Sequence, residues 1–509
     1  MEEHQNESID TVFNCVISYI HNGADRNAVS LVCRKWYELD CMTRKHVTVH
    51  VVYLPTPSRL LKRFPFIESL TLKGLPLYFT ENYSCIGITP WFKELAVSFK
   101  YLKALHVRCI SVLDSDLKLL TRTRGNDLRV LKIIKCQGFS TDGLTHIGKY
   151  CNDLRTLCLD YNTLNEKDGK WVHELAVNNK CIEKLSFYDT AMSKVDVKDL
   201  TLLAKNCRSL VSLKLTRCGL SDLKDFFRTA AMLEVFAGGK FTGDEKDVGF
   251  KFPLNLHSVE FVHMTQSQRQ FVLPHAHRLT ELNLTYDDVD ESCLFYLIKK
   301  CPNLEALYTI DIFGDRGLQL IGESCKKLRK LETFGLVTHR GMVALAQGCS
   351  FLECLHIQFT DISNETLKCI GVHLKSLRDF QLFLCKEDTL TKLPLDGGFR
   401  ALLIGCSKLE RLCIRLRSGG LTDVGLGYIG KYALNLRYLS LGYIGGSDAG
   451  LVKLSKGCPK LRKLEIQNCP FSMQALSTLM INIRSLRYIW ALDDNFRNIF
   501  RLTRRNFEL

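Results

Sequence analysis

The sequence contains no uninterrupted apolar run of about 18 residues, the length that a membrane-spanning helix requires, so we expect no transmembrane segment. Its first seven residues, Met-Glu-Glu-His-Gln-Asn-Glu, lack the basic and apolar regions of a secretory leader. Proline contributes only 11 of 509 residues, and no low-complexity stretch is present. The composition as a whole is ordinary for a soluble protein. We therefore expect localisation in the nucleus, the cytoplasm or both.

The motifs of common catalytic and cofactor sites are also missing. Neither H-E-x-x-H nor G-x-S-x-G occurs, and Glu, His and Cys are spread evenly along the chain. The segment 425–430 matches G-x-G-x-x-G, but that motif must follow a strand directly and open a helix. Here it lies inside an expected helix that Asp423 can cap. We predict no catalytic residue and no nucleotide cofactor, and a chain that is not itself an enzyme.

Paired C-x-x-C ligand sets are absent although the chain has 22 cysteines, so we predict no metal site. Seven cysteines stand three residues before a leucine that opens a repeated phrase: Cys151, Cys207, Cys301, Cys325, Cys349, Cys406 and Cys458. A small apolar thiol packs well at the junction between one repeat's helix and the next strand. We predict that these cysteines are free and buried, as thiols are in a reducing compartment.

The net charge of +15 does not come with a basic block interleaved with aromatic residues, so we expect no nucleic-acid partner. The basic residues are scattered between the leucines at positions that face solvent. An acidic partner or a phosphate-rich small cofactor is the alternative explanation of the charge.

What the sequence does have is a repeat of between 23 and 28 residues in most steps. Leu304, Leu328 and Leu352 stand 24 residues apart, each within an L-x-x-L-x-L phrase, and such leading anchors run from Ile67 to Leu486. This period is typical of leucine-rich repeats, whose strand–helix units must stack to bury a shared core. We predict an α/β solenoid, a horseshoe of about 17 repeats over residues 51–492. Residues 493–509 would form a short basic C-terminal cap.

Two steps are longer, Ile67 to Leu102 and Leu377 to Leu409. Extra residues in a solenoid leave the stack as loops on one rim, which is often the rim that binds a partner. We expect the positions just after the third anchor of each strand to line that rim.

Residues 1–50 are expected to form a small helical module with a linker helix. Val12, Val16 and Ile20 recur at helical spacing, and a second apolar segment follows at 29–36. Two or three such helices cannot bury a core alone. Their apolar face must therefore be covered either by the first repeat, as the cap of the solenoid, or by another protein.

The segment Val29-Ser-Leu-Val-Cys-Arg-Lys-Trp36 resembles the F-box, although Ser8-Ile9-Asp10 stands where that family has a Leu-Pro opening. In the F-box family the helices dock onto a Skp-type adaptor, which links them to a cullin–RING ubiquitin ligase. The resemblance implies an adaptor-binding set: Val12, Val16, Ile20, Val29, Leu31, Val32 and Trp36.

A more specific resemblance rests on segments spread over almost the whole chain: 25–36, 166–175, 314–318, 393–396, 419–423 and 458–461. With these segments the chain is similar to the coronatine-insensitive jasmonate co-receptor family of plants, within the auxin/jasmonate receptor group. The resemblance implies the substrate receptor of an SCF ubiquitin ligase in, or derived from, jasmonate signalling. A jasmonoyl–amino acid conjugate would lie on the upper surface of the solenoid above an inositol polyphosphate. Receptor and ligand together would capture a jasmonate ZIM-domain repressor for ubiquitination and proteasomal degradation.

At the pocket positions the chain departs from that family. Arginines that clamp anions are replaced by Leu77, Ile310, Gln381 and Gln467, two tyrosines by Gln358 and Arg415, and a further basic residue by Cys109. Phe79 and Trp490 are retained, as are the expected polyphosphate residues Lys73, His106 and Arg108. Each lost charge-assisted hydrogen bond costs about 1.5–3 kcal/mol. We therefore expect altered or lost hormone recognition.

Two alternative functions are open at this point. The chain could be a non-productive scaffold or decoy that occupies the adaptor or the repressor. It could also be a receptor for a different, less acidic small ligand, as the apolar and amide side chains at the altered pocket positions suggest.

Overall fold

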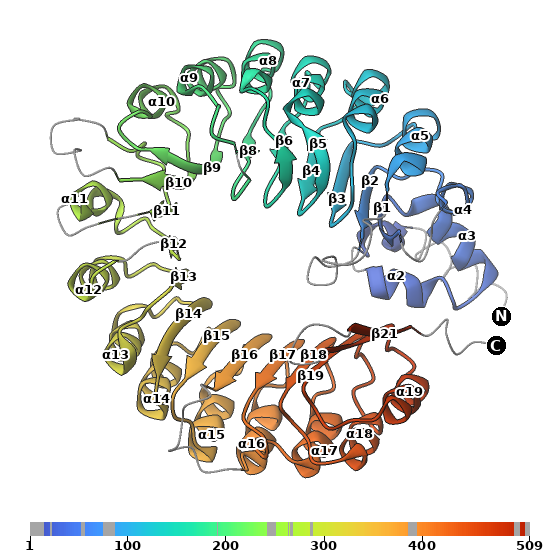
Figure 1. The fold of residues 1–509 in the computed structure, drawn as a ribbon, viewed down its shortest axis with the longest axis vertical. Helices are drawn as coiled ribbons and strands as arrows, with labels where there is room; N and C mark the ends of the chain where they lie inside the picture. The colour runs from blue at the N-terminus through green and yellow to red at the C-terminus, as the bar shows by residue number, and fades with distance from the viewer. Residues whose placement is uncertain are drawn as a thin grey trace. The chain divides into compact units, whose positions relative to one another are not determined.

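A computed structural model shows two compact units, an N-terminal unit of residues 1–255 and a C-terminal unit of residues 256–509 (Figure 1). In each unit, strands line one side and helices pack in a second layer on the other side of the sheet. The structure describes residues 15–20, 23–51, 56–74, 87–190, 192–241, 251–262, 264, 268–285, 289–384, 394–492 and 499–503. The predicted α/β solenoid is confirmed.

In the described residues, the N-terminal unit first shows the short helices η1 (Ile17–Tyr19), α2 (Gly23–Val29) and α3 (Arg34–Thr43). A buried carboxylate, that of Asp40 in α3, holds them together. It accepts hydrogen bonds from Arg26 Nε at 2.8 Å and from Arg44 Nη2 at 2.7 Å. Arg26 also donates to the backbone carbonyl of Ile17 at 2.7 Å, which ties η1 to the same network. The helical module thus has a polar centre in addition to its few apolar contacts.

The rest of this unit alternates strands and helices. Its parallel sheet pairs strands in the order β1-β2-β3-β4-β6-β8-β9-β10, and β5 pairs separately with β7. The elements are β1 (His46–His50), α4 (Ser58–Arg63), β2 (Ser69–Lys73), α5 (Thr89–Ser98), β3 (Ala104–Arg108), α6 (Asp114–Arg124), β4 (Val130–Ile134), β5 (Gln137–Ser140), α7 (Thr141–Tyr150), β6 (Thr156–Cys158), β7 (Thr163–Asn165), α8 (Lys170–Asn178), β8 (Lys184–Ser186), α9 (Val197–Asn206), β9 (Ser212–Gly219), α10 (Lys224–Thr229) and β10 (Val235–Lys240).

The C-terminal unit repeats this plan. Strands β11 to β20 pair in parallel in sequence order, and β21 then pairs antiparallel with β20. The elements are β11 (Ser258–Val262), α11 (Arg269–Val272), η4 (Leu273–His275), β12 (Glu281–Leu284), α12 (Glu291–Lys300), β13 (Ala306–Thr309), α13 (Gly314–Ser324), β14 (Lys330–Val337), α14 (His339–Gly348), β15 (Cys354–Phe359), α15 (Asn364–His373), β16 (Asp379–Leu384), α16 (Asp396–Gly405), β17 (Arg411–Arg415), α17 (Asp423–Tyr432), β18 (Tyr438–Gly442), α18 (Asp448–Ser455), β19 (Lys463–Gln467), α19 (Met473–Asn482), β20 (Tyr488–Leu492) and β21 (Ile499–Thr503).

The core follows from the leucine spacing. Every predicted leading anchor from Ile67 to Leu486 is buried, with at most 2% of its surface exposed. Within a strand the side chains alternate between faces. In β15, Leu355 and Ile357 are buried against the helices, whereas Cys354 and His356 lie half-buried on the opposite face. The polar side chains of the strands therefore lie on the face of the sheet that the helices leave uncovered.

The seven junction cysteines are buried and free, as predicted. Several of these thiols lie within hydrogen-bonding distance of a backbone carbonyl of the preceding repeat. Cys349 Sγ is 3.4 Å from the carbonyl oxygen of Cys325, and Cys406 Sγ is 3.4 Å from that of Leu374. Burial raises the pKa of Cys301 to about 12, so this thiol stays protonated at neutral pH. These cysteines are packing residues.

Side-chain hydrogen bonds, which the sequence did not reveal, also join the N-terminal ends of successive helices. Thr422 caps α17 by accepting a hydrogen bond from the amide of Val424, and its hydroxyl donates to Asp396 of the preceding repeat at 2.5 Å. Asp423 accepts from the Ser447 hydroxyl of the following repeat at 2.7 Å. The expectation that Asp423 caps its own helix was therefore wrong, because its carboxylate reaches the next repeat instead. The segment 425–430 lies inside α17, as expected.

Candidate functional site

Two exposed apolar side chains stand side by side in the sequence, in the turn between α2 and α3. Leu31 is 85% exposed and Val32 is 61% exposed, and their amides bond to the carbonyls of Ala28 and Val29 at 3.1 Å. Val16 is also exposed, whereas Ile20, Val29 and Trp36 are half-buried. Val12 lies outside the described residues. Adjacent exposed apolar side chains of this kind mark an interaction surface.

This turn is presented by a rigid support. Cys33 caps α3 by accepting a hydrogen bond from the Trp36 amide, and the Asp40 network fixes α3 against α2. None of these contacts uses the Leu31 or Val32 side chain. The exposed pair is therefore free to contact a partner without loss of support to the module.

Three predicted polyphosphate residues come together in the N-terminal unit. Lys73 at the end of β2 and Arg108 at the end of β3 are register partners, and His106 lies two residues before Arg108 on the same face. The register partner of His106 on β4 is Lys132. Neighbouring strands are about 4.8 Å apart, so four cationic or basic side chains share one small area.

The electrostatics of this basic group favour an anion. Burial, followed by the charge of Arg108, lowers the pKa of Lys73. Burial, followed by the charge of Lys132, lowers the pKa of His106. Across the part of the chain that the structure describes, no carboxylate forms an ion pair with Lys73, Arg108 or Lys132. Cations that repel one another without a counterion are stabilised when an anion binds.

In the C-terminal unit, three of the altered pocket positions fall in one row across the sheet. Gln358 on β15 and Arg415 on β17 flank Phe383 of β16, and Gln467 on β19 is reached through Gly442 of β18. Arg415 Nη2 donates a hydrogen bond to Gln467 Oε1. The guanidinium carbon of Arg415 lies 5.6 Å from the ring centre of Phe383. The single arginine of this row is therefore already engaged by an amide and an aromatic ring.

The remaining pocket positions are placed differently. Gln381 lies outside the row of Gln358, Arg415 and Gln467, and its register partner is His356 of β15. Trp490 is 4% exposed, and its ring packs edge-on against Tyr488 with 5.9 Å between ring centres, so it offers little open surface to a ligand. Leu77 and Phe79 lie outside the described residues. Cys109 is half-buried directly after β3.

An apolar edge next to Gln358 was not found from the sequence. Ile310, directly after β13, is 42% exposed, and its carbonyl accepts a hydrogen bond from the Phe334 amide at 3.0 Å. Phe334 and Leu336 on β14 are 62% and 47% exposed, and Leu336 is the register partner of Gln358. The available signal was the pair of apolar residues at non-anchor positions of segment 330–337. The register shift within β14 between Glu332 and Leu336 could not be inferred from spacing.

Two side chains with strongly shifted pKa values, those of His356 and Glu332, also lie on the exposed face of β14 to β16. Burial disfavours the charged imidazole of His356, but hydrogen bonds with Asp379, Cys354 and Glu332 outweigh burial and raise the pKa of His356 to about 11. Burial likewise opposes ionisation of Glu332, yet hydrogen bonds with His356 and Lys330 lower the pKa of Glu332 to about 2. These contacts therefore favour the protonated imidazole of His356 and the ionised carboxylate of Glu332.

None of the described helices is long and apolar enough to cross a membrane.

Comparison with known proteins adds the following. An F-box family model matches residues 5–46. The chain is 43% identical over 505 residues to Coronatine-insensitive protein 1 of Arabidopsis thaliana, which covers 95% of this chain and 85% of the relative. It is 43% identical over 502 residues to Coronatine-insensitive protein homolog 1a of Oryza sativa subsp. japonica, with 94% and 84% covered. Among solved structures, the complex of Rad7 and Elc1 in yeast is similar with a TM-score of 0.44 at 14% identity, covering 76% of this chain and 85% of that chain.

Proposed function

The chain belongs to the coronatine-insensitive family of F-box and leucine-rich-repeat proteins, and we propose that it is the substrate receptor of an SCF-type cullin–RING ubiquitin ligase. It contributes no catalytic residue. Its helical module binds a Skp-type adaptor, and its repeats hold a protein substrate for ubiquitin transfer and proteasomal degradation. The observation that carries this proposal is the exposed Leu31–Val32 turn on the F-box module, held rigidly by Asp40.

The physical basis of adaptor binding is the burial of that turn. Burial of an apolar side chain of this size contributes about 1.5–3 kcal/mol to the free energy of binding. The module is covalently joined to the solenoid at β1, which begins at His46, only three residues after α3 ends at Thr43. A short connection of this kind transmits the position of the adaptor to the repeats without a flexible linker.

We further propose that the substrate is a jasmonate ZIM-domain repressor or a protein derived from that signalling system, and that the protein acts in the nucleus, the cytoplasm or both. The support is family membership. The experiment is reconstituted ubiquitin transfer with the chain, a Skp-type adaptor, a cullin–RING core and a repressor, with and without jasmonoyl-isoleucine. Ubiquitin on the repressor only when the chain is present supports the proposal. Capture of the repressor without modification would instead identify a decoy.

A specific observation favours a second candidate, a receptor for a less acidic ligand. The C-terminal unit offers the apolar side chains of Ile310, Phe334 and Leu336 beside the amide of Gln358, and Arg415 is already bonded to Gln467. An apolar surface with a few polar groups suits a mostly apolar small molecule. Mass spectrometry of small molecules that co-purify with the chain separates this candidate from a jasmonate conjugate.

We also propose that the basic group of the N-terminal unit binds an inositol polyphosphate. The variant Lys73→Glu/Arg108→Glu is expected to lower the affinity for inositol hexakisphosphate at least about tenfold, the equivalent of about 1.4 kcal/mol. The reason is that register-paired cations become carboxylates at the place where phosphates would bind. Isothermal titration calorimetry measures the affinity. The salt concentration is set to about 0.15 M, because charges more than about 8 Å from the ligand are then largely screened and contribute little to binding.

The matched control for that double variant is Lys118→Glu/Lys205→Glu. Both lysines are exposed on helices of the same unit, α6 and α9. The control also replaces two cations with two carboxylates, so it changes the net charge by the same amount. The control should bind inositol hexakisphosphate as the unchanged chain does. Equal losses in the two variants would show that only overall charge matters, and would remove the assignment of a site.

A further inference from the structure

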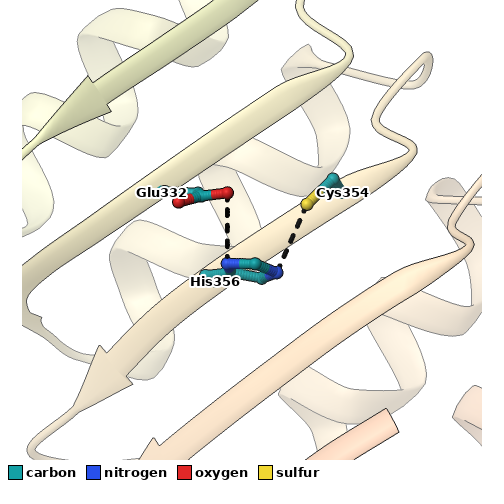
Figure 2. A group of neighbouring side chains, drawn as sticks. All are labelled: Glu332, Cys354 and His356. Atoms are coloured by element: carbon teal, nitrogen blue, oxygen red, sulfur yellow. Dashed lines mark hydrogen bonds and ion pairs between the residues drawn. The ribbon is translucent and has the colours of Figure 1, made fainter. Parts of the chain in front are cut away.

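Four side chains of types that can bind a metal ion meet on the exposed face of three neighbouring strands in the C-terminal unit. We call them the thiol–imidazole cluster: Glu332 on β14, Cys354 and His356 on β15, and Asp379 on β16. Figure 2 shows the side chains of the first three turned toward one another. The register explains the arrangement, because Glu332 is the partner of His356 and Cys354 is the partner of Asp379.

Distances within the cluster are short. His356 Nε2 lies 3.3 Å from Cys354 Sγ and 3.3 Å from Asp379 Oδ1. On the other side of the ring, His356 Nδ1 lies 3.3 Å from Glu332 Oε1. The donor atoms of Glu332, Cys354 and His356 all fall within 4.8 Å of one another. The side chains of His356, Glu332 and Asp379 are 21%, 28% and 22% exposed, so an ion from solvent can reach them.

The chemistry of the donors selects the ion. A thiolate, an imidazole and a carboxylate are the ligands of zinc sites, where zinc–sulfur and zinc–nitrogen bonds are about 2.3 and 2.0–2.1 Å long. Calcium and magnesium prefer oxygen ligands only. We propose that the thiol–imidazole cluster binds a single divalent zinc ion, with water at any coordination position that the protein leaves open. Zinc ligands must be deprotonated, so binding releases the thiol proton of Cys354 and the proton on the ligating nitrogen of His356.

The two carboxylates have distinct parts in this site. Only one nitrogen of His356 can bind the ion, and a carboxylate stands beside each nitrogen. The carboxylate on the far nitrogen then accepts its N–H and fixes the ring, as orienting partners do in histidine–zinc sites. Each carboxylate also pairs with a cation. Arg411 Nε lies 3.0 Å from Asp379 Oδ2, which leaves Oδ1 facing His356. Lys330 Nζ lies 2.7 Å from Glu332 Oε1, the oxygen that faces His356 Nδ1.

Zinc at this place would tie β14, β15 and β16 together from the face that no helix covers. The site is adjacent to the pocket row, because Gln358 follows His356 by two residues on β15 and Gln381 is the register partner of His356. The proposal does not depend on adaptor binding or on the ligase function, since it rests only on the side chains of the C-terminal unit.

The test uses the full chain, stripped with a chelator and then loaded with Zn²⁺ or with Co²⁺ as a spectroscopic substitute. We expect one tightly held zinc per chain by elemental analysis, a thiolate-to-cobalt charge-transfer band, and a Zn²⁺-dependent rise in melting temperature. Cys354→Ser should abolish the band and the thermal shift. Asp379→Asn and Glu332→Gln should each weaken zinc binding, with a loss of about 10- to 100-fold for the one that orients the ring.

The matched control is Cys413→Ser, because Cys413 is also half-buried on the same face, one strand beyond Asp379, and is the register partner of Gln381. Its zinc content and cobalt band should equal those of the unchanged chain. Circular dichroism verifies that each variant is folded. If the folded chain holds no zinc, or if Cys354→Ser retains the band and the thermal shift, the cluster is an ion-pair network only and the proposal is wrong.

Discussion

Leu31→Glu combined with Val32→Glu is expected to abolish co-purification of the chain with a Skp-type adaptor. Both side chains are mostly exposed and make no contribution to the Asp40 network, so the module should stay folded. Each lost apolar contact is worth about 1.5–3 kcal/mol, and each new carboxylate must be desolvated in the interface. We expect the affinity to fall at least about 100-fold, which corresponds to about 2.8 kcal/mol. Surface plasmon resonance with immobilised adaptor measures the loss.

The matched control is Val97→Glu, on α5 of the same unit, where the valine side chain is 74% exposed. It introduces a charge at an exposed apolar position outside the F-box match of residues 5–46. This control should bind the adaptor normally. Unchanged binding by the double variant would place the docking surface elsewhere, and a chain that never binds the adaptor would refute the ligase assignment.

Asp40→Ala is expected to destabilise the helical module by about 3–5 kcal/mol. Removal of one partner from a buried ion pair leaves an uncompensated charge, and here both Arg26 and Arg44 lose their carboxylate. Asp40 is 0% exposed, so water cannot replace it without opening the module. Amide hydrogen exchange in α2 and α3 measures the local stability, and adaptor affinity should fall with it.

Glu38→Ala on the same helix is the control for that variant. Glu38 pairs with Arg34 at 3.0 Å, but both side chains are largely exposed, and exposed pairs contribute only about 0–1 kcal/mol. Exchange in α2 and α3 should therefore be nearly unchanged. If Asp40→Ala has no larger effect than Glu38→Ala, the buried ion pair does not hold the module.

The repeat architecture was predictable because its period is imposed by burial. A leucine at each leading anchor must face the helices, and the structure buries all of them from Ile67 to Leu486. The junction cysteines were predictable for the same reason, since each stands three residues before an anchor, in the connection between a helix and the next strand. These features depend on local spacing and on one apolar face, both of which are visible in the amino-acid sequence.

Features that depend on the register between strands were not predictable. Arg415 and Gln467 are 52 residues apart in sequence, yet they share a row and a hydrogen bond. The thiol–imidazole cluster was missed because its residues come from three repeats and show no C-x-x-C spacing. The bulge in β14, which sets Leu336 opposite Gln358, likewise follows from packing against neighbouring strands rather than from the period.

The sequence also could not state which apolar residues of the first module face outward. The resemblance to the F-box placed Ile20, Val29 and Leu31 in one adaptor-binding set without ranking them. The structure separates them, because Leu31 stands in a turn and is 85% exposed whereas Ile20 and Val29 are half-buried. The difference arises from where α2 ends, at Val29, which a few residues of periodic pattern do not determine.

Hydrogen–deuterium exchange of the 509-residue chain, measured with and without a Skp-type adaptor, reads the docking surface at peptide resolution. We expect slower exchange in α2, α3 and the turn that carries Leu31 and Val32, with exchange in β14 to β18 unchanged. That pattern is what a substrate receptor requires, because the adaptor must engage the module and leave the repeats open to the substrate. No slowing in residues 23–43, or slowing confined to the repeats, would contradict the assignment of this chain to a ubiquitin ligase.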